Sequence, residues 1–235
     1  MIKSRLIYIF FLFILFAMQC SCKKEIKQEI IEKKSIKIEE KITLEPIIQS
    51  KSFDSINHNN AIDFLIAYGK LHKEHKVRIK TRLGDLIVQL YNDTPLHRAN
   101  FIFLTKVGYF NTTCFHRVAP NFIVQGGNAE GYETLEIRNK YQNYTIPAEF
   151  RKHRKHKYGA FAAARDWDNN ISKKSTPFEF YIIQAKQGAH HINGEHTVFG
   201  ELIDGFDVLE KISKVATGRD EWPLEDVYLE IEVME

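Results

Sequence analysis

The residues best suited to chemistry lie between positions 115 and 127, where an arginine, aromatic side chains, a glutamine and two glycines fall close together. Pro120 fixes its own φ angle and Asn121 tolerates unusual backbone angles, so this pair predicts a turn between two short strands. Arg117 then lies beside Phe122 and Ile123. A guanidinium group always carries charge and presents its donors in a rigid fork, so beside an apolar wall it can hold a carbonyl group whose substituent enters the wall. This arrangement suits a neutral, partly apolar amide.

A purely structural explanation of the same run remains open. Its apolar residues also fit the core strands of a barrel, and Arg117 would then cover one end of the barrel without binding a ligand. The pattern of residue types does not separate these two interpretations.

Cysteine and histidine offer two other kinds of chemistry. Cys114 and His116 lie two residues apart, which places them on one face of a strand, but no third residue is in view to orient the histidine as a base. A thiol nucleophile is therefore disfavoured. No carboxylate or cysteine recurs at a metal-ligand spacing around the other histidines, so we expect hydrogen-bonded or solvated histidines and no metal. These histidines are His153, His156, His190, His191 and His196.

Many short strands and two helices are predicted around this run. Residues 77–90 alternate in polarity about a turn, which predicts a β-hairpin. The segment 94–107 is typical of a helix that has proline in its first turn and glycine after its end. No regular alternation of strand and helix is present, which favours an antiparallel barrel or sandwich with helices at its ends. The remaining predicted elements are strands at 115–124, 159–164, 178–183, 197–200 and 227–233 and a helix at 206–212.

The run from 115 to 127 resembles the signature of the cyclophilin family of peptidyl-prolyl cis-trans isomerases. The resemblance continues in the same order along the chain and covers residues 76–235. It implies a mainly β fold, namely a closed eight-stranded antiparallel barrel capped by two helices, and an enzyme that rotates X-Pro peptide bonds without a cofactor. The residues shared with the signature are Phe115-His116-Arg117, Pro120, Phe122 and Gln125-Gly126-Gly127.

The resemblance also implies a set of site residues. Arg117 matches the catalytic arginine of the family, with Phe122 and Gln125 in the same catalytic group. Later segments resemble those that line the family's peptide groove. They imply substrate-binding roles for His116, Ile123, Ala164, Arg165, Glu179, Tyr181, Ile192 and His196.

Three departures from the family pattern bear on the substrate. Glu179 stands where the family usually has glutamine, and its carboxylate could pair with Arg165 or Arg117. His191 stands at the place of a tryptophan found in many relatives. The stretch 165–177 is longer than in compact relatives. The substitutions at Glu179 and His191 leave a second hypothesis open, a cyclophilin-shaped module that binds proline-containing segments with little or no turnover.

The first residues carry a pattern similar to a bacterial lipoprotein signal. Lys3 and Arg5 precede an uncharged apolar run at 6–18, which has the length of a signal-peptide core and is short for a membrane span. Cys22 follows a small residue, so we expect cleavage before Cys22 and its acylation, with Cys20 as the alternative. An uncleaved membrane anchor is a further alternative. Either arrangement predicts an extracytoplasmic, membrane-anchored domain on the periplasmic side.

Composition divides the chain into four predicted parts. Residues 1–21 form the signal peptide, 22–56 a charged tether, 57–75 a helical extension and 76–235 the cyclophilin-like domain. An interaction helix is the alternative for the tether. The net charge is +3 and no basic stripe stands out, so we expect no nucleic-acid partner. The expected partners are proline-containing polypeptide segments and a lipid membrane, and the expected state is a monomer.

Overall fold

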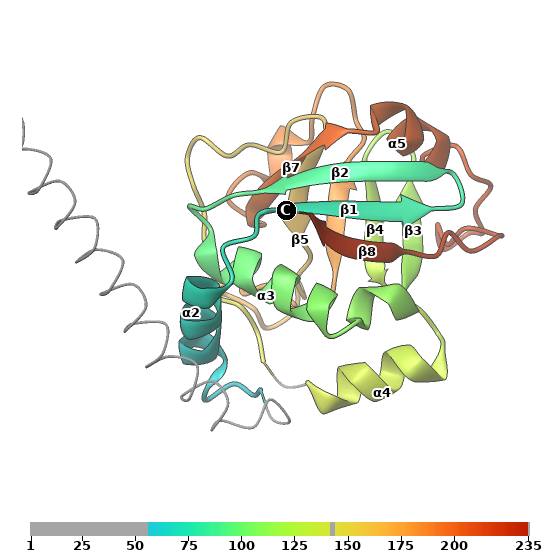
Figure 1. Ribbon diagram of the computed structural model, residues 1–235. Helices are drawn as coiled ribbons and strands as arrows, with labels where there is room; N and C mark the ends of the chain where they lie inside the picture. Colours follow the sequence, from blue (N-terminus) through green and yellow to red (C-terminus); the bar gives the residue numbers. More distant parts are fainter. Residues whose placement is uncertain (1–55, 142–143, 235) are drawn as a thin grey trace, which may run out of the picture. The chain divides into compact units, whose positions relative to one another are not determined.

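An antiparallel sheet of eight strands forms the centre of the structure (Figure 1). The computed structural model describes residues 56–141 and 144–234, which lie within one compact unit, Ser52–Glu235. The strands are β1 (Lys76–Thr81), β2 (Gly84–Leu90), β3 (Cys114–Ala119), β4 (Ile123–Asn128), β5 (Ala160–Ala163), β6 (Phe180–Ile183), β7 (Val198–Asp204) and β8 (Glu230–Met234). Their order in the sheet is β3-β4-β6-β5-β7-β2-β1-β8.

The sheet curls so that its two ends come close together. Cys114 on β3 forms a single bridge with Tyr228, just before β8. Beside it, the amide of Phe115 donates to the carbonyl of Val227 at 2.9 Å. No ladder of paired residues joins β3 to β8 in the described part of the chain. The fold is therefore mainly β and antiparallel, as a curled sheet, and full closure into a barrel stays a prediction.

Four α-helices lie in the described ranges, and three of them lie within residues 76–235, one more than the two capping helices that the family resemblance implied. α3 packs against α2 and runs along one end of the sheet, whereas α5 lies at the other end (Figure 1). The helices expected near residues 60–74, 94–107 and 206–212 are confirmed. The helices are α2 (Ala61–Leu71), α3 (Pro95–Lys106), α4 (Tyr132–Lys140) and α5 (Phe206–Ile212), with short 3-10 helices η2 (Tyr109–Thr112) and η3 (His190–Ile192).

The sequence pattern did not predict α4, because this helix has almost no buried face. Thr134 is its one buried residue, and the Thr134 hydroxyl donates to the Thr112 carbonyl at 2.6 Å. Glu133 in the first turn and Lys140 in the last turn suit the helix dipole. A polar helix of this kind lacks the apolar periodicity from which helices are predicted.

Both faces of β5 and β6 are buried, so the strands beneath the site are packed on both sides. Side chains alternate between the two faces of a strand. On β6, Phe180 and Ile182 therefore belong to the main core, whereas Tyr181 and Ile183 belong to a second apolar cluster on the opposite face. This double coverage explains why the sequence of β6 is apolar throughout.

The predictions for the first part of the chain lie outside the described residues. They are the signal peptide 1–21, the acylation of Cys22 or Cys20, and the tether 22–56 except for residue 56. Within 56–141 and 144–234, no helix has the length and apolar character needed to cross a bilayer.

Gly127 and Gly108 offer a matched pair of substitutions that tests the packing behind β4. Both have positive φ angles, 95° and 78°. A Cβ atom at Gly127 would overlap the carbonyl oxygen of Phe178, whereas one at Gly108 would meet nothing within 4 Å. We expect Gly127→Ala to lower the free energy of unfolding by roughly 1–3 kcal/mol more than Gly108→Ala, because only the first adds a steric clash to the backbone strain. Urea unfolding of both variants measures the difference, and equal losses would contradict the clash.

Candidate active site

A cavity of about 260 Å³ opens beside β3, β4 and β6. All of its lining residues except Trp167 were predicted from the sequence as site residues. Two other predicted site residues, His116 and Glu179, do not line it. The lining residues are Arg117, Phe122, Ile123, Gln125, Ala164, Arg165, Trp167, Tyr181, Ile192 and His196.

The register of four neighbouring strands sets the central side chains in one row. Arg117 on β3 lies opposite Gln125 on β4, which in turn lies opposite Tyr181 on β6. Tyr181 also lies opposite Ala162 on β5. Residues directly opposite each other project from the same face of a sheet. A guanidinium group, an amide and an aromatic ring therefore share one face.

The turn between β3 and β4 places Phe122 at the rim of the cavity. Asn121 adopts a left-handed φ of 57°, which asparagine tolerates better than most residues, so the chain reverses tightly as predicted. The Phe122 ring then stacks on His191, with the ring centroids 5.6 Å apart. His191, at the position where the resemblance expected a tryptophan, thus packs against Phe122, which lines the cavity.

Arg117 is held at one edge of its guanidinium group. Its Nε donates to Oε2 of Glu221 at 2.7 Å, and the two side chains are 38% and 39% exposed. Among the described residues, no protein group bonds to the two terminal nitrogens of Arg117. These nitrogens remain available to donate to a ligand in the cavity.

Glu179 lies behind the cavity, where it orients Gln125. The amide nitrogen of Gln125 donates to Oε2 of Glu179 at 3.0 Å, and Nη2 of Arg138 donates to Oε1 at 3.0 Å. The predicted pairing of Glu179 with Arg165 or Arg117 is therefore wrong, because α4 supplies the cationic partner. With its nitrogen engaged, Gln125 offers its amide oxygen, an acceptor, to a ligand.

His116 is buried behind the same network and does not reach the cavity. Its Nε2 lies 3.7 Å from Oε2 of Glu179, and its ring centroid lies 5.6 Å from that of Trp222. Burial lowers the pKa of His116, although the nearby Glu179 carboxylate opposes the shift. His116 therefore supports neighbouring side chains as a neutral ring.

Tyr181 is fixed by a buried histidine that the sequence did not predict as a site residue. Nδ1 of His156 faces the side-chain oxygen of Asn193 at 3.0 Å, so Nδ1 carries the hydrogen and Nε2 accepts from the Tyr181 hydroxyl at 3.0 Å. The Tyr181 hydroxyl is thus satisfied inside the protein. Tyr181 can then present its ring to the cavity without leaving a polar group unpaired.

This buried histidine makes stability depend on pH. Burial lowers the pKa of His156 from 6.5 to about 4. The unfolded chain takes up a proton near pH 6.5 while the folded ring stays neutral, so its contribution to stability is present above pH 6.5 and is lost as pH falls towards 4. We expect unfolding in urea to show about 2 kcal/mol less stability at pH 5 than at pH 7.5 from this residue. His156→Asn should have a shallower pH profile, and parallel profiles would contradict the assignment.

Arg165 and Trp167 form a further part of the cavity wall. Arg165 donates from Nε to the Glu195 carbonyl at 2.8 Å and from Nη2 to the Glu195 carboxylate at 2.9 Å. Its guanidinium carbon lies 4.0 Å from the centroid of the Trp167 ring, a cation–π contact. Trp167 is 62% exposed and also contacts the ring of His196 edge-on at 5.2 Å. Arg165, predicted to bind substrate, therefore positions this wall as well as lining the cavity.

Ala164, Ile192 and His196 complete the predicted wall residues. Ala164 follows β5, where its amide donates to the Glu179 carbonyl at 3.0 Å, and Ile192 ends η3. Nδ1 of His196 lies 3.2 Å from the Ala163 carbonyl, which assigns the ring hydrogen to Nδ1. Burial lowers the pKa of His196, so this ring enters the cavity wall uncharged.

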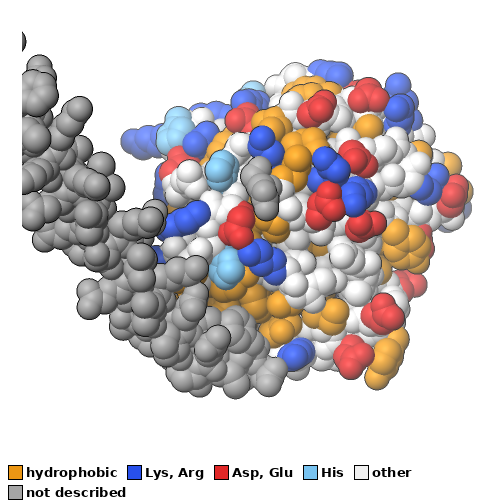
Figure 2. Space-filling view, viewed as in Figure 1, with side chains coloured by type: hydrophobic (Ala, Val, Ile, Leu, Met, Phe, Trp, Pro, Cys, Tyr) orange, Lys and Arg blue, Asp and Glu red, His pale blue; other side chains and the backbone are white. Residues whose placement is uncertain are grey.

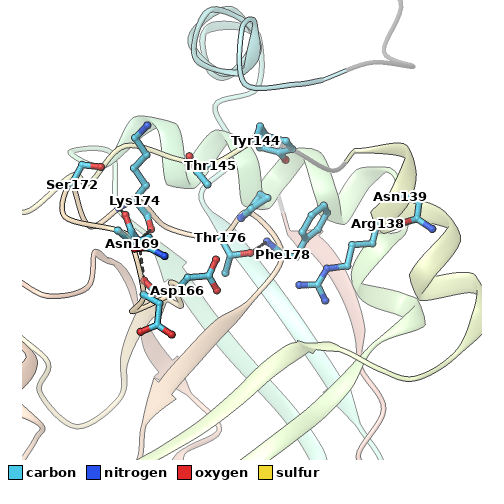
Figure 3. A pocket seen from close by; sticks show the side chains of 13 residues that line it. Arg138, Asn139, Tyr144, Thr145, Asp166, Asn169, Ser172, Lys174, Thr176 and Phe178 are labelled. Carbon is cyan, nitrogen blue, oxygen red and sulfur yellow. Dashed lines mark hydrogen bonds between the residues drawn. The ribbon is translucent and has the colours of Figure 1, made fainter.

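A second and larger cavity, about 510 Å³, lies between the end of α4 and the stretch 166–178 (Figure 3). Arg138 borders it, so the cavity adjoins the network that orients Gln125. The other lining residues are Asn139, Tyr144, Thr145, Asp166, Asp168, Asn169, Asn170, Ser172, Lys174, Thr176, Pro177 and Phe178. Its walls are therefore mainly polar and carry both signs of charge.

No cluster of His, Cys, Asp or Glu suited to a metal ion occurs among the residues that the structure describes. The sequence did not predict four residues of the cavity and its supporting contacts, namely Trp167, His156, Arg138 and Glu221. A tryptophan inside an otherwise polar stretch was the one local signal available for Trp167. The other three are recognisable only from their partners in the folded chain.

Comparison with known proteins shows a match to one protein family and to several of its members. Residues 76–233 match the family model described as cyclophilin type peptidyl-prolyl cis-trans isomerase/CLD. Peptidyl-prolyl cis-trans isomerase B of Escherichia coli is 32% identical over 165 residues, which cover 66% of this chain and 96% of that protein. The peptidyl-prolyl cis-trans isomerase-like 2 protein of Rhizopus delemar is 33% identical over 68% of this chain, but the chain spans only 29% of its length.

Solved structures show the same fold. The crystal structure of a cyclophilin type peptidyl-prolyl cis-trans isomerase from Cryptosporidium parvum has a TM-score of 0.58 and 24% sequence identity, and the match covers 69% of this chain and 98% of that chain. A second crystal structure of that protein was obtained in the presence of the dipeptide Ala-Pro.

Proposed function

Because the chain belongs to the cyclophilin-type peptidyl-prolyl cis-trans isomerase family, we propose that its folded domain catalyses rotation about X-Pro peptide bonds. The observation that carries the proposal is the row of Arg117, Gln125 and Tyr181 beside a largely apolar cavity. The Ala-Pro dipeptide used with the Cryptosporidium parvum relative supports a proline-containing ligand.

The chemical problem is the barrier to rotation of a single amide. It amounts to about 18–20 kcal/mol, and uncatalysed X-Pro isomerisation takes tens to hundreds of seconds. Only one molecule reacts, so bringing reactants together contributes little. The enzyme must bind the twisted amide more strongly than the planar one.

The apolar walls favour the twisted amide. Twisting localises the lone pair on nitrogen and reduces the charge separation across the amide. An apolar surface therefore destabilises the more polar planar form relative to the twisted one. The proline ring is expected to lie against Phe122, Ile123, Tyr181 and Ile192.

Polar groups act at two edges of this surface. The terminal nitrogens of Arg117, to which no described residue bonds, can donate to the proline nitrogen or to the neighbouring carbonyl as the amide twists. The side-chain oxygen of Gln125 can accept from a backbone N–H of the peptide. Gln125 thus holds one side of the amide while the other side turns.

The position of Glu179 argues against a module that binds without turnover. Its departure from the family pattern motivated that hypothesis, but its carboxylate is bonded to Arg138 and Gln125. It therefore leaves the cavity free of an added negative charge and orients a binding residue.

A protease-coupled cis/trans assay on an X-Pro peptide tests the proposal with the purified full chain. We expect the chain to accelerate the slow phase in proportion to its concentration. Binding of the peptide without acceleration, measured by calorimetry on the same preparation, would support the binding module.

We further propose that the domain acts outside the cytoplasm, as a monomer tethered to a membrane, on proline-containing segments of folding proteins. The basic residues, the apolar run at 6–18 and the adjacent Cys22 support this location. Mass spectrometry of the mature N-terminus tests it. An acylated Cys22 or Cys20 is expected, and an intact Met1 on a protein found in the soluble fraction would refute it.

A further inference from the structure

Glu221 contacts the guanidinium group on which the proposed reaction depends. Its Oε2 lies 2.7 Å from Nε of Arg117, although the two residues are 104 positions apart. Nε is the donor nearest the aliphatic stem. A carboxylate bonded there limits rotation of the guanidinium plane without itself engaging either terminal nitrogen.

The backbone around Glu221 is attached to β3 at the neighbouring residue. The amide of Val118 donates to the Glu221 carbonyl at 2.8 Å, which fixes this loop one residue beyond Arg117. Glu221 itself has a left-handed φ of 65°, a conformation that costs energy for a residue other than glycine. The loop therefore holds the Glu221 side chain close to Arg117.

The same loop is braced by hydrogen bonds between its own residues. Its arms are joined by hydrogen bonds from the amide of Gly218 to the carbonyl of Trp222 and from the amide of Leu224 to the carbonyl of Ala216, both 2.8 Å long. The Trp222 indole donates to Asp226 at 3.0 Å. A loop braced in this way is suited to positioning the contact between Glu221 and Arg117.

We infer that Glu221 is a positioning residue for isomerisation, which holds the Arg117 guanidinium in the orientation that meets the twisted amide. The inference rests on the proposed function, because Arg117 must first contribute to catalysis. It predicts an effect on the chemical step and little effect on substrate binding, since the apolar walls that hold proline do not include Glu221.

The test compares full-length variants by steady-state isomerisation kinetics. Glu221→Ala is expected to lower kcat about 3- to 10-fold with KM changed less than about twofold, because a freed arginine side chain must be ordered again in each turnover. Glu221→Gln, which keeps an acceptor, should recover part of the loss. Glu225→Gln is the matched control on the same loop, since Glu225 pairs with Arg82 and does not contact Arg117.

A double-mutant cycle separates positioning from a general structural effect. In the Arg117→Ala background, Glu221→Ala should cause no further loss of kcat, because the group it positions is gone. The Nε–H resonance of Arg117 should be protected from exchange in the wild-type chain and lose that protection in Glu221→Ala.

Three results would overturn the inference. They are an unchanged or raised kcat in Glu221→Ala, the same fold-loss in the Arg117→Ala background, and a loss confined to KM. If the wild-type chain shows no isomerisation at all, the proposed function fails. If Arg117→Ala is impaired while Glu221→Ala equals the wild type, only the role of Glu221 fails.

Discussion

Replacing Arg117 by alanine is expected to lower kcat/KM for an X-Pro peptide by about 10- to 150-fold, the value of one charge-assisted hydrogen bond of about 1.5–3 kcal/mol. The terminal nitrogens of Arg117 have no protein partner in the described ranges, so their loss removes donors that are available to a ligand. The protease-coupled assay on the full chain measures this effect. The cavity walls remain in place, so residual activity above the uncatalysed rate is also expected.

Two further variants make the result specific. Arg117→Lys keeps the charge but loses the fork that reaches Glu221 and the ligand together, so its activity should fall between the wild type and Arg117→Ala. Arg151 does not line the cavity and donates to the neighbouring Phe150 carbonyl, so Arg151→Ala should match the wild type. Equal losses in Arg117→Ala and Arg151→Ala would show that the effect does not come from the site.

Replacing Phe101 by alanine is expected to lower the free energy of unfolding by about 3–5 kcal/mol. Phe101 is 2% exposed and packs α3 against the sheet. Its ring stacks on Phe110 at 4.6 Å and meets Phe161 edge-on at 5.2 Å and Phe180 at 5.5 Å. Truncation would leave a cavity at the junction of several aromatic rings, which cannot all move to fill it.

Urea unfolding measures this loss, and a helix surface residue provides the control. Ile66 on α2 is 48% exposed, so Ile66→Ala should cost less than about 1 kcal/mol. If Phe101→Ala also costs less than about 1 kcal/mol, the rings around Phe101 must collapse into the vacated space.

Local sequence patterns predicted much of this fold because many elements carry their own signals. Proline at the start and glycine after the end delimit α3, and alternation delimits the hairpin of β1 and β2. The pattern failed for α4, whose residues are polar because only Thr134 is buried. Burial drives the periodicity that prediction uses, so an element with almost no buried face carries little signal.

Most of the cavity lining was predictable from the family resemblance, in the strands and also in loops such as those of Phe122 and Arg165, whereas contacts between distant segments were not. Arg117, Gln125 and Tyr181 lie in strands whose register sets them in a row. Glu221 and His156, in contrast, act through single hydrogen bonds to Arg117 and Tyr181. Such bonds depend on loop conformations that apolar periodicity does not encode.

Figure 2 shows lysine, arginine and histidine side chains gathered at the upper left of the molecule, where Figure 1 draws the loop that leads into β5. This loop contains the run Arg151 to Lys157, in which five residues are lysine or arginine and two are histidine, one of them the buried His156. The sequence interpretation that no basic stripe stands out therefore overlooked a local concentration of charge. Asp93 pairs with His153 and Arg154, and Glu201 pairs with Lys157, which offsets part of that charge.

The row of site residues across β3, β4 and β6 depends on how these strands are aligned with one another. Side chains alternate along a strand, so a shift of β4 by one position against β6 would turn Gln125 to the opposite face from Tyr181. The register of the backbone hydrogen bonds thus fixes which side chains share one face of the sheet. A chain in which these strands were misaligned would lose the row of site residues. Evolution can therefore alter the loops around the cavity, such as 165–177, without moving the functional groups in the row.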